Sequence, residues 1–179
     1  MSEATQPPEF PRPIAVDQLK DREKHFVIEA DEAERKALAK RFGILGIDTL
    51  KAHLTLKPLA GNMVRLAGRV EAQVHQACVV TLVDVPAKIE EEFERVYSPD
   101  AKPPSDDLDD MEFDLDAEEP PDPLVDGIID IGEAVAEEVA LALDPYPRAP
   151  GAVFDRPEEG EPEQRQNPFA ALAKLKKEK

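Results

Sequence analysis

Three histidines and a single cysteine are the side chains in this sequence best suited to catalysis or metal binding. His53 and His75 fall at polar positions of two segments with alternating hydrophobicity, and no nucleophile is spaced to pair with either. The sequence contains no serine elbow, phosphate-binding glycine loop or His-Glu-x-x-His motif. We therefore expect His25, His53 and His75 to be solvated, and the protein not to be an enzyme.

Cys78 is the one cysteine of the chain, so it cannot form an internal disulfide. A zinc ion needs about four ligands of the cysteine or histidine type, which a lone cysteine does not supply. We expect no metal, no cofactor and no catalytic residue. The expected role of Cys78 is that of a small residue at the end of a hairpin.

Four basic residues share one face of a predicted β-hairpin, and they could contact phosphates. They are Lys51, Lys57, Arg65 and Arg69. No aromatic residues alternate with them for base stacking. An ordinary solvated sheet face is the favoured interpretation, and an RNA-facing basic patch is the alternative.

A strongly acidic stretch lies between Pro99 and Asp126. It holds nine Asp and three Glu against one Lys, a net charge of −11. Residues 99–123 also contain six of the 18 prolines, so we expect a disordered acidic loop. Such a loop could serve solubility, attract a basic protein or compete with RNA. The alternation of Met111, Phe113 and Leu115 with acidic residues favours docking.

The C-terminal tail has the opposite charge and an apolar stripe. Five Lys or Arg against one Glu give residues 164–179 a net charge of +4. The predicted docking residues are Asn167, Pro168, Phe169, Leu172, Leu175 and Lys176. So short a helix is marginal alone, so it should fold on a partner or on its own domain. The Glu- and Pro-rich linker before it favours a partner.

The elements that must position these groups begin with a hairpin. Apolar residues alternate from Leu50 to Leu56 and again from Val64 to Val74, with a Gly-Asn turn between the two segments. Because one face must be buried, Leu56 should lie beside Val64 or Leu66. A third strand, from about Ala87 to Tyr97, completes a meander.

Two shorter strands are predicted near the N-terminus. Ile14 and Val16 alternate as an edge strand, since Pro11 and Pro13 lack the amide hydrogen that a central strand needs. The segment from His25 to Glu29 is the other.

Two helices are predicted by capping boxes. Asp31 stands three residues before Glu34, and the helix should run to about Phe42. Its expected buried side is Leu38, Phe42 and Leu45. Asp130 stands three residues before Glu133, and the second helix should run from Ile131 to about Leu143. Its apolar stripe is Ile131, Val135, Val139 and Ala142, widened by Ala134, Leu141 and Leu143.

Together these patterns predict an α+β fold, in which a small antiparallel sheet packs against two helices. We expect one domain over residues 1–155 and a flexible linker with a short amphipathic tail over 156–179. The net charge of −17 favours basic partners and disfavours nonspecific binding to DNA. The sequence has no apolar run of membrane-spanning length, and the polar N-terminus does not resemble a signal peptide. We expect a cytoplasmic protein.

Two motifs carry a resemblance to a known family. Asp126-Gly-Ile-Ile-Asp-Ile-Gly-Glu133 runs into an apolar helix, and Asn167-Pro-Phe-Ala170 opens the tail. With Cys78 between two alternating strands, they resemble the bacterial and plastid YceD family, the large ribosomal RNA subunit accumulation proteins. Many such relatives have Cys-x-x-Cys where this chain has Cys78 and Thr81, so a zinc site is not carried over.

The resemblance implies a noncatalytic factor in ribosome biogenesis that promotes accumulation of large-subunit ribosomal RNA. The implied partners are that RNA or a precursor particle, a ribosomal protein or an RNA-modifying enzyme. The alternative is an acidic adaptor or chaperone that holds a basic ribosomal protein without touching RNA. RNA binding would depend on the basic hairpin face and the tail, whereas chaperoning would depend on the acidic loop.

Overall fold

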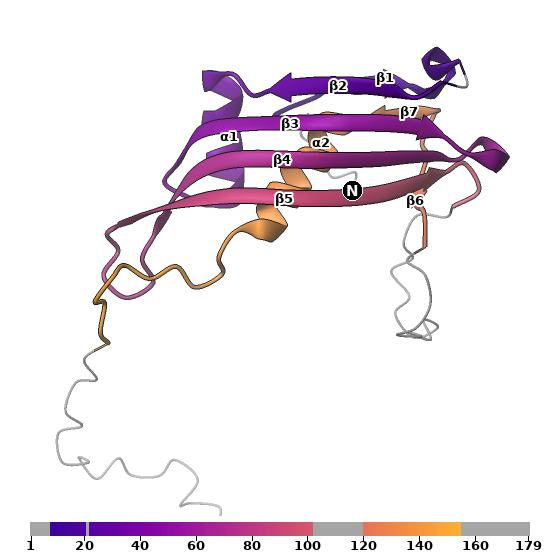
Figure 1. Ribbon diagram of the computed structural model, residues 1–179. Coiled ribbons are helices and arrows are strands. Elements are labelled where there is room, and N and C mark those ends of the chain that lie inside the picture. Colours follow the sequence, from indigo (N-terminus) through magenta and orange to yellow (C-terminus); the bar gives the residue numbers. More distant parts are fainter. Residues whose placement is uncertain (1–7, 21, 102–119, 155–179) are drawn as a thin grey trace, which may run out of the picture.

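A twisted sheet forms one layer of the molecule, and two helices pack behind it, while no helix or strand of the described residues covers the opposite, open face (Figure 1). The computed structural model describes residues 8–20, 22–101 and 120–154. Within these ranges the strand order is β2-β3-β4-β5-β6. The strands are β2 (Lys24–Glu29), β3 (Gly46–Pro58), β4 (Val64–Ala77), β5 (Asp84–Ser98) and β6 (Asp122–Pro123). Strands β3 to β5 form the predicted antiparallel meander, β2 pairs antiparallel with β3, and the fold is α+β.

The register of the central hairpin is the one that the hydrophobic pattern requires. Leu56 lies opposite Leu66, which confirms the prediction, and both are fully buried. One irregularity interrupts the β3–β4 ladder, between Ile47 and Thr49. The β4–β5 ladder runs from Val64–Tyr97 to Ala77–Asp84 without a shift. The helix-covered face therefore holds the core, while the polar residues of the same strands share the open face.

Gly68 marks a tight point at the centre of the buried face. It lies between Leu54 of β3 and Phe93 of β5. A Cβ atom on residue 68 would lie 2.5 Å from a Leu54 methyl and 2.7 Å from the Phe93 ring. The aromatic ring thus occupies the space that a side chain at position 68 would need.

Helix α1 (Glu32–Phe42) has the predicted capping box. Asp31 accepts a hydrogen bond from Glu34 N at 2.8 Å, and Asp31 N donates to the Glu34 carboxylate at 2.9 Å. The helix ends at Gly43, whose φ of 68° is left-handed. The prediction that Leu45 is buried is wrong, since it is 58% exposed. After the turn at Gly43, Ile44 packs against the core instead.

Helix α2 (Ile131–Ala142) buries most of its predicted stripe, including Ile131, Val135 and Val139. Leu141 was expected on the buried side, but it is 78% exposed. It lies near the end of the helix beside Phe93 and Val96 of β5, where the sheet ends and no described element covers it. None of the described helices is long and apolar enough to cross a membrane.

A second sheet of two strands closes one side of the domain. Strand β1 (Pro13–Ala15) pairs antiparallel with β7 (Ile128–Asp130). The predicted edge strand is therefore present at Ile14, whereas Val16 begins the 3₁₀ helix η1 (Val16–Leu19). A second 3₁₀ helix, η2 (Ala60–Asn62), forms the β3–β4 turn. The β1–β7 pairing brings the N-terminal segment next to the start of α2.

Candidate functional site

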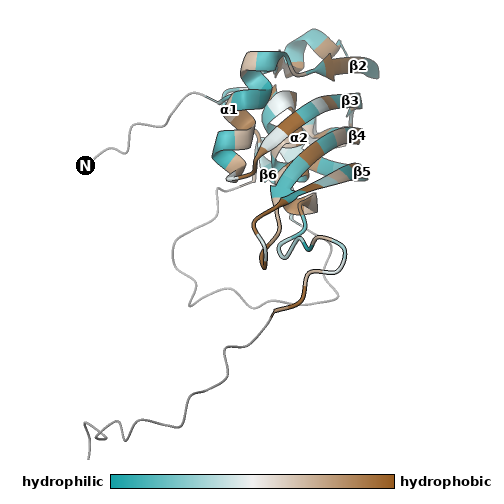
Figure 2. Cartoon of the chain, turned by 90° about the vertical axis from the view of Figure 1, so that its left-hand side faces the viewer, coloured by the Kyte–Doolittle hydropathy of each residue, from teal (hydrophilic) through white to brown (hydrophobic). Residues whose placement is uncertain are grey.

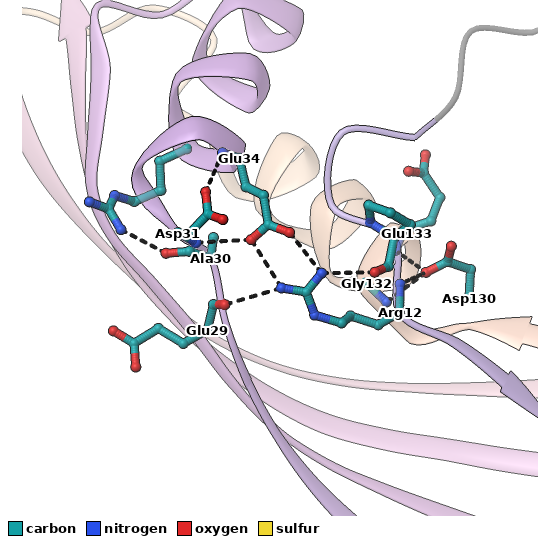
Figure 3. Close-up of polar contacts among 10 residues, drawn as sticks. Arg12, Glu29, Ala30, Asp31, Glu34, Asp130, Gly132 and Glu133 are labelled. Carbon is teal, nitrogen blue, oxygen red and sulfur yellow. Dashed lines mark hydrogen bonds and ion pairs between the residues drawn. The ribbon is translucent and has the colours of Figure 1, made fainter.

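The most specific motif of the sequence, Asp126–Glu133, joins distant parts of the chain (Figure 3). One oxygen of Asp130 accepts hydrogen bonds from Arg12 N at 2.8 Å, Gly132 N at 3.0 Å and Glu133 N at 3.1 Å. The carboxylate therefore caps α2 and holds the N-terminal segment at the same time. Satisfying free amides at a helix start is a structural role.

Gly132 of the same motif permits an unusually close approach of two backbones. A Cβ atom at position 132 would lie 1.9 Å from the carbonyl oxygen of Phe10. Gly132 is buried, and the Phe10 side chain is 0% exposed. We call Phe10, Arg12, Asp130 and Gly132 the N-terminal clasp. It fixes the segment before β1 against the first turn of α2.

Charged side chains surround the clasp and tie α1 to it (Figure 3). Arg12 donates to both carboxylate oxygens of Glu34, at 2.7 and 3.0 Å, and its guanidinium lies 4.4 Å from the Phe10 ring centroid. The hydrogen bond from Arg12 lowers the pKa of Glu34. Glu34 therefore stays ionised while it also caps α1.

Glu133 does not complete the second capping box that its spacing predicts. Its carboxylate binds Arg41 of α1 at 2.5 and 2.9 Å, and Arg41 also reaches Glu9 at 3.0 Å. The hydrogen bond with Glu133 raises the pKa of Arg41. The reciprocal half of the box is lost because an arginine from another helix is a stronger partner for the carboxylate than a backbone amide. Glu133 thus links the two helices.

His75 was expected to be solvated, but both nitrogens of its ring contact carboxylates. Its ring lies between two carboxylates, Asp48 at 2.9 Å and Asp84 at 2.8 Å, and its side chain is 28% exposed. Hydrogen bonds to Asp48 and then Asp84 raise the pKa of the imidazole. These contacts join the starts of β3 and β5 to the end of β4. The group is an ion-pair link at one end of the sheet.

Cys78 lies in the β4–β5 turn and is fully buried. Its sulfur accepts hydrogen bonds from Ala149 N at 3.3 Å and Thr81 N at 3.5 Å. These bonds lower the pKa of the thiol to about 6, against the opposing effect of its burial. Val79 N also donates to Pro147 O at 2.8 Å, so the chain after α2 is fastened to this turn. Among the described residues, no three His, Cys, Asp or Glu side chains gather as a metal site.

The four predicted basic residues lie on the open face of the hairpin, with Lys57 opposite Arg65 and His53 opposite Arg69. The two arginines, which lie on β4, have acidic neighbours on β5, which the sequence reasoning missed. Arg65 pairs with Glu94 at 3.1 Å, and Arg69 lies 3.3 to 3.8 Å from Glu71, Glu90 and Glu92. A phosphate group would have to compete with these carboxylates.

The acidic row, which we define as Glu90, Glu92 and Glu94, follows the outermost long strand of the sheet. All three side chains are exposed on the open face, and the Glu92 side chain is the most exposed of them at 81%. The glutamates at the even-numbered positions 90, 92 and 94 of the predicted third strand, which share one face of a strand, were the signal that could have found this surface. It places three carboxylates along one edge of the molecule, where they pair with Arg65, Arg69 and Lys88 of the same face.

The other predicted docking residues lie outside the described part of the chain. They are Met111, Phe113 and Leu115 of the acidic loop and Asn167, Pro168, Phe169, Leu172, Leu175 and Lys176 of the tail. Their roles stay predictions, as do the RNA contacts of Lys51, Lys57, Arg65 and Arg69.

The described residues form an α+β domain whose most specific motif organises the backbone and whose polar groups gather on an open sheet face. Comparison with known proteins gives the family. The family model described as large ribosomal RNA subunit accumulation protein YceD matches residues 66–176. The chain therefore belongs to the YceD family, as the resemblance indicated. No curated protein and no solved structure matches it.

Proposed function

We propose that this protein is a noncatalytic factor that promotes accumulation and maturation of large-subunit ribosomal RNA. The family match over residues 66–176 supports the link to that RNA. One observation supports a noncatalytic role: the motif residues Asp130, Gly132 and Glu133 are engaged in holding backbone and helices together. These groups are occupied by the fold, so binding is the activity that its exposed surfaces can perform.

The net charge of the chain favours a basic polypeptide as the binding partner. Arg65 and Arg69, half of the predicted RNA-facing patch, are already engaged by glutamates. The chain carries a net charge of −17, which repels phosphates and attracts arginine and lysine. The factor then acts by holding a basic component of the large subunit, such as a ribosomal protein. Direct contact with RNA through the remaining basic residues and the tail is the second candidate.

Genetic depletion and crosslinking together test this function. Removing the gene from the source organism should lower the ratio of large- to small-subunit ribosomal RNA, and the full chain should restore it. Tagged full-length protein should co-sediment with large-subunit precursors and crosslink to a basic protein there. Crosslinks to RNA alone would favour the second candidate, and an unchanged RNA ratio would reject the proposed function.

A further inference from the structure

The outer edge of β5 is the longest stretch of strand that has no partner within the described residues. β6 pairs with it only at Tyr97 and Ser98. From Asp84 to Arg95 the structure records partners on the β4 side alone. The ladder with β4 has no bulge in this range, so the edge is regular. An edge of this kind is a template for another strand.

The direction of the hydrogen bonds fixes which backbone groups this edge offers. Cys78 N donates to Val83 O at 2.8 Å at the turn, and the next registered pair is Ala77–Asp84. Hydrogen-bonded pairs alternate along an antiparallel ladder, so the odd-numbered residues of β5 bond to β4. The even-numbered residues point their N–H and C=O groups outward.

Two independent observations agree that the backbone groups of the even-numbered residues point outward. Leu124 N donates to the outward carbonyl of Ser98 at 2.9 Å, where β6 covers the edge. Pro86, which has no N–H to offer, also falls on an outward position. The part of the edge that β6 leaves uncovered therefore runs along Lys88, Glu90, Glu92 and Glu94, because Asp122 of β6 lies opposite Tyr97 and so bonds to the flanking Val96 and Ser98. The acidic row belongs to these same residues.

A groove of about 660 Å³ adjoins the second half of this edge. Its apolar lining comes from Phe93 and Val96 of β5 and from Leu141 of α2, which is 78% exposed. Its charged lining comes from Glu94, Asp122 and Glu138 and from Arg95, which pairs with Glu138 at 2.7 Å. A strand added to the edge would place alternate side chains toward the acidic row and toward Leu141.

The charge of the edge selects its partner. A second copy of β5 would bring glutamates beside glutamates, which is destabilising, and phosphates would meet the same repulsion. Residues 102–119, which join β5 to β6 in the sequence, have nine acidic residues and one lysine and are also disfavoured. An extended segment rich in arginine or lysine gains both backbone hydrogen bonds and ion pairs.

We propose that the β5 edge from Lys88 to Glu94 binds a basic, extended polypeptide segment by strand addition. Basic side chains of the added strand face the acidic row, and an apolar residue on its other side enters the groove at Leu141. The binding itself rests on the edge alone. Only the identity of the client as a large-subunit component rests on the proposed function.

Hydrogen exchange on the full-length protein tests which backbone amides of the β5 edge point outward. The probe is a synthetic peptide of about nine residues in which arginine and valine alternate. In the free protein, amides of Glu90, Glu92 and Glu94 should exchange fast, while those of Glu91 and Phe93 exchange slowly. Saturating peptide should protect the three fast amides about tenfold or more.

Two results of this experiment would overturn the proposal. Slow exchange at Glu90, Glu92 and Glu94 in the free protein would mean that another part of the chain already covers the edge. Unchanged exchange at these amides in the peptide complex would mean that binding is electrostatic only. A peptide of the same sequence, N-methylated at every second residue, controls for charge and should give no protection.

Matched variants at Glu92 separate the hydrogen bond from the charge. Glu92→Pro removes both an outward N–H and a charge, and it should weaken peptide binding about tenfold or more relative to Glu92→Gln, which removes the charge alone. Proline is tolerated at an outward edge position, so the melting temperatures of the two variants should be similar. Equal affinities in two folded variants would contradict strand addition. If Glu92→Pro unfolds, Glu90→Pro against Glu90→Gln repeats the comparison.

Failure of this proposal and failure of the proposed function give different results. If the peptide protects the edge amides but depletion leaves the ribosomal RNA ratio unchanged, the binding site is supported and the proposed function is rejected. If depletion lowers the ribosomal RNA ratio, but Glu92→Pro complements as well as Glu92→Gln and the protein does not distinguish the unmodified from the N-methylated peptide, the proposed function is supported and the strand-addition site is rejected.

Discussion

Backbone amides are hydrogen-bonded at the N-terminal clasp, whereas the outward backbone groups of the β5 edge are not paired among the described residues. At the clasp, one Asp130 oxygen accepts three amide hydrogens, and Gly132 lets the Phe10 backbone come close. At the edge, the outward groups of Lys88 to Glu94 have no partner among the described residues. The comparison teaches that the most specific motif of the sequence serves folding. The β5 edge, which is available for binding, consists of common residue types whose side chains alternate between the two faces of the sheet.

Gly132→Ala should break the clasped region most severely. The new methyl would lie 1.9 Å from the Phe10 carbonyl oxygen, so the N-terminal segment must move away. We expect a loss of about 3 kcal/mol or more in the free energy of unfolding, although alanine alone favours a helix. Chemical denaturation measures it.

Gly46→Ala is the matched control for that variant. A Cβ atom at Gly46 meets nothing within 4 Å, and its φ is not left-handed. Its free energy of unfolding should change by less than about 0.5 kcal/mol. Equal stabilities of the Gly132 and Gly46 variants would show that the clasp does not hold the N-terminal segment in solution.

Asp130→Ala should have the next largest effect. It removes the cap of α2 and leaves Arg12 N without its acceptor, so we expect a loss of about 2 kcal/mol. Asp31→Ala, which removes the cap of α1 alone, should cost about 1 kcal/mol. Thermal or denaturant unfolding compares the two. A larger cost at Asp31 would mean that the bond between Asp130 and Arg12 N contributes nothing.

Much of this fold could be predicted because its patterns are local. The Leu56–Leu66 register follows from strict alternation, and the α1 cap follows from residues three apart. The clasp could not be predicted in this way, because Arg12 and Asp130 are 118 residues apart and no local pattern links them. The exposure of Leu141 was missed for a similar reason, since it depends on where the sheet ends.

The candidate surfaces show the same division. Alternation placed Lys51, Lys57, Arg65 and Arg69 on one face, but only the β4–β5 register places Glu90, Glu92 and Glu94 beside the two arginines. The free side of β5 depends on what pairs beyond it, which is a property of the whole sheet. Residue types alone could therefore suggest a basic patch and could not show that glutamates engage it.

The predicted tail sharpens the comparison, because it should affect binding without affecting folding. Replacing Phe169, Leu172 and Leu175 with serine should change the melting temperature little, since the described core lies before Gly151. The variant should be lost from large-subunit precursor fractions and fail to restore the RNA ratio after depletion. A large drop in melting temperature would assign the tail to the core, and full complementation by the folded variant would reject tail docking.

His75 should give the smallest effect, and it reports on the end of the sheet where the β5 edge begins. Its pKa is raised in the folded protein by Asp48 and Asp84. Protonated His75 therefore stabilises the fold fully below its unfolded pKa of about 6.5, and this contribution is lost as the pH rises through the folded pKa. The stability difference between the parent and His75→Gln should be larger at about pH 5.5 than at a pH above the raised pKa of the imidazole. Because the side chain is partly exposed, salt should reduce the difference. His53→Gln, which removes an exposed imidazole from the same open face, is the control for the loss of the ring itself. A constant difference between parent and His75→Gln across this range would show that Asp48 and Asp84 do not hold the ring in solution. The start of the β5 edge would then lack the anchor that its contacts indicate.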